Sequence, residues 1–206
     1  MWADGLDRDI PFVVTEYGYS PFATSAEDDL EGAIVNLDGV GMILSMGGDA
    51  AYLYGYEPDE VEKETPCTSG NNMILLMMPD DSLKKTSTFY AAEMMTSEWL
   101  MRSGGKHELL STNSDSPTVG AYAVNRPDGR ISILLLNRDP ERSTAVTLKA
   151  DGAVQMYDAS QFSHSQYTWN SMLGRPAKDD PPVHFVADAS RPVELPPYSI
   201  TVLRQR

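Results

Sequence analysis

The sequence predicts an α/β segment followed by an all-β domain, and two observations support this prediction. First, short apolar runs at residues 11–15 and 50–56 are separated by a helical repeat of apolar residues, which is the order of a βαβ unit. Second, the chain beyond the Gly-Gly pair near its middle alternates short β-type runs with turn residues. Because that pair separates the two patterns, we expect one unit at residues 1–105 and another at residues 106–206.

Composition indicates a globular protein with an acidic surface. The 206 residues are 41% hydrophobic, which suffices for a sizeable core. A formal net charge of −14 argues against nucleic acid and anionic membrane surfaces as partners. No apolar run approaches the roughly 20 residues of a membrane span, so none is predicted. The oligomeric state and the compartment stay open, although an extracellular or periplasmic location would fit.

The cysteine and histidine residues predict neither a disulfide framework nor a metal site. Cys67 is the only cysteine, so no intrachain disulfide can form. His107, His164 and His184 lie far apart in the sequence, without the short spacings typical of zinc ligands. We therefore expect no metal and no cofactor.

The first predicted strand ends on a charged residue. Phe12, Val13 and Val14 are typical of a buried strand, which runs into Glu16 and is broken by Gly18. In parallel sheets of enzymes, ligands bind at the carboxyl ends of the strands, where a catalytic residue is placed. Glu16 is therefore the leading catalytic candidate. The alternative is a strand-end carboxylate that is hydrogen-bonded to neighbouring backbone.

An amphipathic helix is predicted to follow this strand. Ser25 is a candidate N-cap, and the acids at residues 27–29 then fall in the first turn. Leu30, Ile34, Leu37, Gly41 and Leu44 recur at three- and four-residue steps and form one apolar face. The small residues of this helix suit close packing against a sheet. Gly-Gly at 47–48 is the predicted end of the helix.

A second strand at residues 50–56 completes the predicted βαβ unit, whose strands we expect to be parallel. A loop-rich insertion is predicted at residues 59–86, with a short apolar segment at 73–78. A second helix is predicted at residues 87–101, because Tyr90, Met94 and Trp99 supply a buried stripe.

The second half of the chain predicts an antiparallel sandwich. Asp128-Gly129 lies between two apolar runs and is a strong hairpin signal. Residues 160–174 are predicted to be a polar loop without an assigned position. The predicted strands are residues 119–124, 131–136, 145–148, 153–157, 184–186 and 199–203.

Two parallel strands alone cannot cover both of their faces, so the first unit needs more sheet. The simplest completion is a (β/α)₈ barrel of which this chain holds the last two βα units, strands seven and eight. The predicted fold is thus the C-terminal segment of a TIM barrel followed by an antiparallel β-sandwich. In that arrangement Glu16 and Glu57 lie on the same rim.

Residues 13–18, Val-Val-Thr-Glu-Tyr-Gly, resemble the seventh-strand motif of clan A glycoside hydrolases, in which the glutamate is the nucleophile. Residues 70–92 resemble the segment after the eighth strand in that clan. Residues 120–139 and 195–202 are similar to the sandwiches of families 39, 51, 30 and 79. The resemblance implies a retaining hydrolase of O-glycosyl bonds that acts on oligosaccharides, polysaccharides or other glycosides, with Glu16 as nucleophile.

The chain departs from that clan in one respect. The clan's acid/base residue lies on the fourth strand, usually in an Asn-Glu pair, and this sequence contains no such dipeptide. We therefore expect the chain to be a fragment that is inactive alone, with the true N-terminus lying upstream of Met1.

Four residues near the predicted rim are candidate substrate contacts. Tyr17 either lines the sugar site or packs, and Tyr56 faces either the rim or the barrel core together with Tyr54. Glu57 either binds sugar hydroxyls or forms a turn before its proline. Asn72 and Asn71 lie in the predicted insertion and could extend into the substrate cleft at the rim of the barrel.

The alternative function is a non-catalytic carbohydrate-binding or structural module in which the sandwich is the functional part. An exposed aromatic platform on the sandwich would favour it. Tyr167 and Trp169 are the candidate platform residues.

Overall fold

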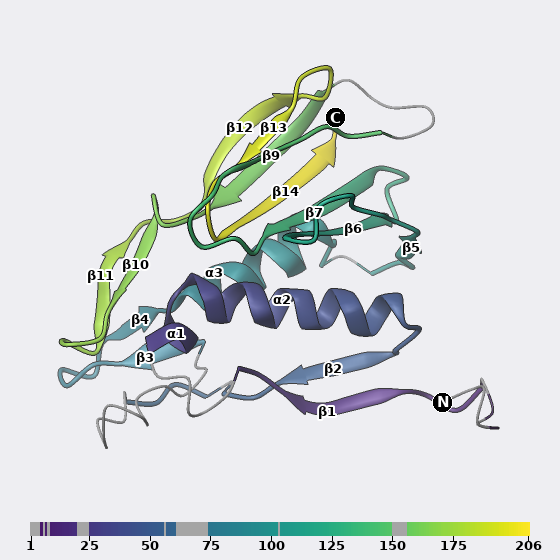
Figure 1. Cartoon of the computed structure of the whole chain (residues 1–206). Helices are drawn as coiled ribbons and strands as arrows, with labels where there is room; N and C mark the ends of the chain where they lie inside the picture. Colours follow the sequence, from purple (N-terminus) through teal and green to yellow (C-terminus); the bar gives the residue numbers. More distant parts are fainter. Residues whose placement is uncertain are drawn as a thin grey trace.

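The computed structural model describes residues 5, 7, 9–19, 25–55, 57–60, 74–102, 104–149 and 156–206. Figure 1 shows stacked layers: a pair of parallel strands, then helices, then a large antiparallel sheet with a smaller pair of strands above it. The predicted α/β-then-β order is confirmed in this arrangement.

The first layer is the pair β1 (Val13–Tyr17) and β2 (Ala50–Leu53), which run parallel as predicted. Between them the chain forms α1 (Ser25–Asp28) and α2 (Leu30–Ser45). The amide of Phe12 donates to Oδ2 of Asp49 over 2.7 Å, which aligns the starts of the two strands. The strand–helix–strand order of the first unit is therefore confirmed.

The second half of the chain forms a six-stranded antiparallel sheet with one smaller strand pair on its outer face. The order across the large sheet is β12 (Val183–Asp188), β9 (Met156–Phe162), β14 (Ser199–Gln205), β7 (Ile131–Asn137), β6 (Val119–Asn125) and β5 (Glu108–Leu110). The smaller pair joins β13 (Val193–Leu195) and β8 (Thr144–Val146). The predicted hairpin is the β6–β7 pair, where Gly129 has a φ of +77°.

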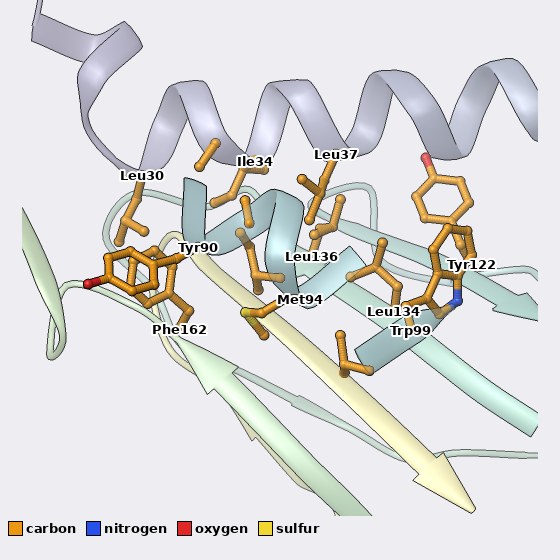
Figure 2. Packing of buried hydrophobic residues seen from close by; sticks show 14 of the residues in the cluster. Leu30, Ile34, Leu37, Tyr90, Met94, Trp99, Tyr122, Leu134, Leu136 and Phe162 are labelled. Atoms are coloured by element: carbon orange, nitrogen blue, oxygen red, sulfur yellow. The ribbon is translucent and has the colours of Figure 1, made fainter. Parts of the chain in front are cut away.

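Alternate residues of the large sheet supply two separate cores. On the helix side, Leu134, Leu136 and Val202 pack with α2 and α3 (Ser87–Glu93), as Figure 2 shows for the two leucines. On the other side, Leu135 and Leu203 pack beneath the small strand pair. Because the first core contains residues from both halves of the chain, helices and sheet share it. The division at residue 105 stays a prediction.

The predicted apolar face of α2 is confirmed. Leu30, Ile34 and Leu37 are buried and point toward α3 and the sheet (Figure 2). Gly41 meets the ring of Tyr122 from β6, and a Cβ at Gly41 would lie 2.5 Å from Cζ of that ring. The glycine thus permits the close helix–sheet packing that the sequence indicated.

The helix begins differently from the prediction of one helix starting at Ser25. Asp29 is extended, with φ −96° and ψ −176°, and its Oδ1 accepts from the amide of Leu30, so that α2 starts afresh. A Cβ at position 32 would lie 2.1 Å from the carbonyl oxygen of Glu27, so Gly32 lets α1 close against α2. Glu27 and Asp28 do lie in a first helical turn, that of α1, but the prediction of one continuous helix is wrong because Asp29 separates α1 from α2.

The second helix covers the predicted range with a change of winding. The helix α3 starts at Ser87 after the N-cap Thr86, whose Oγ1 accepts from the amide of Phe89. It continues as the π-helix η2 (Met94–Trp99). The predicted stripe is confirmed, because Tyr90, Met94 and Trp99 are all buried.

Two segments predicted to be loops contain hairpins. The insertion holds β3 (Leu75–Met77) and β4 (Leu83–Lys85), which are antiparallel. The predicted polar loop at 160–174 is wrong. It holds the end of β9 and also β10 (Tyr167–Asn170), which pairs with β11 (Arg175–Asp179). These strands are only three to five residues long, so an alternating pattern is hard to recognise in them.

The carboxyls of α1 have unusual surroundings. Glu27 and Asp28 are each 2% exposed, and Oε2 of Glu27 and Oδ2 of Asp28 accept no hydrogen bond from any residue that the structure describes. Desolvation is the main cause that raises the pKa of Glu27 to about 8 and that of Asp28 to about 7. Neighbouring acids add to both shifts, Asp28 for the first and Asp29 for the second. Both carboxyls therefore hold their protons well above the usual range.

A single methyl group on α2 tests the helix–sheet contact. Gly41→Ala should destabilise the chain by about 1–3 kcal/mol, because its Cβ overlaps the buried Tyr122 ring. The control Gly39→Ala adds a Cβ at an ordinary 3.8 Å from the Tyr17 ring, so it should be neutral or stabilising by up to about 1 kcal/mol. Urea unfolding of both variants measures this difference, and equal effects would contradict the packing described.

The buried carboxyls predict that stability falls with rising pH. Unfolded carboxyls lose their protons near their ordinary pKa values of 4.5 and 3.8, whereas the folded chain keeps them to about pH 8 and 7. The two protonated carboxyls contribute fully to the free energy of unfolding below about pH 4, and this contribution is lost by about pH 8. The loss is no more than about 1.4 kcal/mol per pH unit for each carboxyl. Urea midpoints measured from pH 4 to 9 give the profile.

Glu27→Gln should flatten that profile above pH 4.5, because an amide keeps its hydrogen atoms at every pH in this range. Glu57→Gln, at an exposed position, is the matched control and should leave the slope unchanged. An unchanged slope in Glu27→Gln would show that the Glu27 carboxyl is ionised in the folded chain.

Candidate active site

The carboxyl ends of β1 and β2 point to the same end of the molecule. Figure 1 shows both arrows running toward the end where α1 and the hairpins β3–β4 and β10–β11 lie. The helix α2 covers one face of the strand pair, and the opposite face is open in the described structure. This open face is the natural place for a ligand at the ends of parallel strands.

A β-bulge places Glu16 on that open face. Val14 pairs with Ala51 and Tyr17 pairs with Leu53, so β1 carries two residues, Thr15 and Glu16, where β2 carries one. Without the extra residue, strict alternation would put Glu16 on the helix side together with Val14. Both bulge residues are exposed instead. Bulges commonly re-aim side chains next to active sites.

The carboxylate of Glu16 has no hydrogen bond or ion pair with any described residue. The alternative of a strand-end carboxylate bonded to neighbouring backbone therefore lacks support in the described part of the chain. The group is left available to a ligand.

Tyr17 lies on the other side of the strand. Its ring is beside Gly39 of α2, at 3.8 Å from the position of a Cβ there. Burial raises the pKa of its phenol to about 12. This placement favours the packing role that the sequence left open, and the substrate contact of Tyr17 stays a prediction.

Tyr52 of β2 and Tyr54, which directly follows that strand, lie on the open face. Tyr52 and Tyr54 are 60% and 58% exposed, whereas Leu53 between them is half-buried opposite Tyr17. Sequence reasoning considered Tyr54 but missed Tyr52. The signal was available, because side chains two residues apart on a strand share a face. Tyrosine rings suit the flat, partly apolar faces of sugars.

The remaining predicted contacts are only partly described. Glu57 is exposed and precedes Pro58 in a bend, and the carbonyl of Asp59 then accepts from the amide of Met77 over 2.9 Å. This geometry fits the turn that was the alternative for Glu57. Tyr56 and Asn72, with Asn71, lie outside the described residues.

The segment after β1 is tied to α2. The hydroxyl of Tyr19 donates to Oε1 of Glu31 over 2.7 Å. This hydrogen bond is the main cause that raises the pKa of Tyr19 to about 12. Burial, followed by the negative charge of Glu31, raises the pKa of Tyr198. The chain just beyond Glu16 is thus anchored near the segment that precedes β14.

The residues proposed for an aromatic platform on the sandwich do not form one. Tyr167 is fully buried, and Trp169 is half-buried against the helix-side core. The prediction of a platform from these two side chains is therefore wrong. Tyr167 packs inward because β10 contacts α1 and because its ring centroid lies 6.0 Å from that of Phe162 at the end of β9.

Among the described residues, no three His, Cys, Asp or Glu side chains are grouped so that they would hold a metal ion. Nor does any helix in the described ranges combine the length and apolar character needed to cross a membrane.

Comparison with sequence families identifies a match in the second half of the chain. Residues 117–203 match the model of the D-apionate lactonase C-terminal immunoglobulin-like domain. This region contains β6 to β13 and most of β14. No curated protein matches the chain.

Solved structures of glycoside hydrolases share the fold. An α-L-arabinofuranosidase from Thermotoga maritima is 15% identical, with a TM-score of 0.64, and the match covers 96% of this chain and 43% of that one. A GH51 arabinofuranosidase from Xanthomonas axonopodis pv. citri is 16% identical, with a TM-score of 0.61, over 97% and 42% of the two chains. The catalytic domain of GH30 xylanase C from Talaromyces cellulolyticus is 14% identical, with a TM-score of 0.59, over 95% and 41%.

The chain thus spans about two-fifths of the length of these three structures. Nearly all of it has a counterpart in them, from β1 to β14. The predicted resemblance to clan A glycoside hydrolases is confirmed at the level of fold, and this chain has the fold of part of such an enzyme.

Proposed function

We propose that this chain carries the nucleophile of a retaining glycoside hydrolase, and that the nucleophile is Glu16. The observation that supports this most directly is the β1 bulge, which turns the Glu16 carboxylate onto the open face at the carboxyl end of a parallel strand. The shared fold with glycoside hydrolases agrees with this placement.

The chemistry follows from a carboxylate on that face. The Glu16 oxygen attacks the anomeric carbon, the glycosidic C–O bond breaks, and the leaving oxygen takes a proton from an acid/base residue. Water deprotonated by the same residue then cleaves the glycosyl ester and restores the carboxylate. The acid/base residue must lie about 5–5.5 Å from Glu16 and belongs to polypeptide outside these 206 residues.

The surface around Glu16 supports a larger sheet. Val13, Tyr52 and Tyr54 expose apolar surface on the open face of the strand pair. Val35 and Met42 on α2, and Met46 at its C-cap, are exposed as well. We infer that further strands and helices cover these residues and complete a (β/α)₈ barrel, since a two-stranded sheet is marginal alone.

A second hydrolytic function is favoured by the family match. The model that fits residues 117–203 is that of a lactonase domain, so a sugar lactone is an alternative substrate. Glu16 would then act as general base for water attacking the lactone carbonyl, and ring opening would give a hydroxy acid. No glycosyl-enzyme ester forms on that route, so covalent labelling separates the two functions.

The nucleophile is tested in the natural protein that contains this chain. A 2-deoxy-2-fluoroglycoside with a good leaving group should label the peptide carrying Glu16, as detected by mass spectrometry. Glu16→Gln should lose the label and lower turnover by at least about 10³-fold, because the variant lacks the attacking carboxylate.

Glu108→Gln is the matched control, since it removes an exposed carboxylate on β5 and should keep the label. Label on another residue, or normal turnover by Glu16→Gln, would contradict the assignment. Hydrolysis of lactones with no label from any fluoroglycoside would instead support the lactonase.

A further inference from the structure

We propose that the pocket between the hairpins β3–β4 and β10–β11 is an anion subsite, which binds a carboxylate of an acidic saccharide through Lys84 and Arg175. That the ligand is a saccharide rests on the proposed function, whereas the anion site rests on the pocket itself. The pocket has a volume of about 360 Å³, within the size range of small-ligand sites. Its lining residues are Met78, Lys84, Asn170, Leu173, Arg175, Pro176, Ala177 and Asp179.

The first wall is held by the β3–β4 hairpin. Lys84 pairs with Leu76, whose side chain is buried, so the backbone that carries the lysine is anchored. The amide of Met78 donates to the carbonyl of Ser82 over 2.8 Å and closes the turn. The backbone of Lys84 is thus held in place by the hairpin.

The second wall is held by the β10–β11 hairpin. Arg175 pairs with Asn170, and Oδ1 of that asparagine accepts from the amide of Leu173 over 3.1 Å. Gly174 has a φ of +57°, which allows the tight turn. At the other end of β11, Oδ1 of Asp179 accepts from the hydroxyl of Tyr90 over 2.8 Å, which joins this wall to α3.

The two cations of the pocket are available to a ligand. Neither Lys84 nor Arg175 forms a salt bridge or hydrogen bond with another described residue. Lys84 lies near enough to Asp80 to contribute to its lowered pKa, but Oδ1 of Asp80 is occupied by the amide and hydroxyl of Ser82. Neighbouring Lys85 differs, because its Nζ lies 4.4 Å from the centroid of the Phe89 ring.

The other groups of the pocket fit the rest of a sugar. Met78, Leu173 and Pro176 offer apolar surface for the C–H face of a pyranose. Asp179 and Asn170 can bind hydroxyl groups. A guanidinium and an ammonium together bind a carboxylate, with the guanidinium able to donate two hydrogen bonds to it.

The location agrees with a substrate that extends beyond the reacting sugar. Both hairpins lie at the end of the molecule toward which β1 and β2 run (Figure 1). A chain bound at Glu16 would extend across this end. An acidic sugar other than the one at the cleaved bond is therefore the unit that the pocket would select.

The test is a binding titration of the natural protein that contains this chain, with tetragalacturonate and with its fully methyl-esterified form, which differ only in the carboxylates. Calorimetry should give at least about tenfold tighter binding of the acid form. Equal affinity for the two forms would overturn the proposal. Inorganic phosphate is the third probe, and phosphate binding as tight as that of tetragalacturonate would overturn the saccharide assignment.

Variants locate the binding. Lys84→Gln and Arg175→Gln should each weaken tetragalacturonate binding about tenfold or more. Arg175→Lys should weaken it less than Arg175→Gln, because it keeps the charge but loses the paired hydrogen bonds of the guanidinium. Lys106→Gln, which removes an exposed cation outside the pocket, is the matched control and should bind normally. Unchanged binding in the Lys84→Gln, Arg175→Gln double variant would overturn the site.

Glu16→Gln separates this inference from the proposed nucleophile. The variant should bind tetragalacturonate normally, because the pocket does not include position 16. Lost binding in Glu16→Gln would place the ligand at the open face of β1 and overturn the pocket assignment. The fluoroglycoside label on Glu16 is independent of every result of this titration.

Discussion

The arrangement depends on α2 being covered on two opposite sides. On one side it lies over β1 and β2, where Tyr17 rests beside Gly39. On the other side it packs on α3 and meets the Tyr122 ring at Gly41. Asp38, one turn earlier, accepts from the hydroxyl of Tyr122 over 2.6 Å and pairs with Arg138 over 2.9 Å. The strand pair that carries Glu16 is thereby held in a fixed position relative to the large sheet.

The packing of α2 against one face of β1 determines which side chains remain exposed on the other face. Val14 and Tyr17 are half-buried on the side of β1 that faces the helix. The extra residue of the bulge therefore leaves Glu16 on the side away from the helix. Tyr52 and Tyr54 of the neighbouring strand lie on that same side. A carboxylate and aromatic side chains on one face support the proposed role of Glu16 in glycoside hydrolysis.

Features of the fold that depend on local sequence could be predicted, whereas features that depend on contacts between distant segments could not. The face of α2 and the Asp128-Gly129 hairpin were visible because apolar spacing and turn chemistry are local signals. The β1 bulge was not visible, because pairing with β2 decides which residue is extra. The burial of Tyr167 was also missed, since only its packing against α1 and β9 makes β10 an inward-facing strand.

The most direct test of this account is the distance between two carboxyl groups in a crystal structure of the natural protein that contains this chain. The Glu16 carboxylate should lie on the open face of β1, about 5–5.5 Å from a second carboxyl supplied by another strand of the completed sheet. A structure in which no carboxyl lies within about 10 Å of Glu16, or in which Glu16 packs against α2, would contradict it.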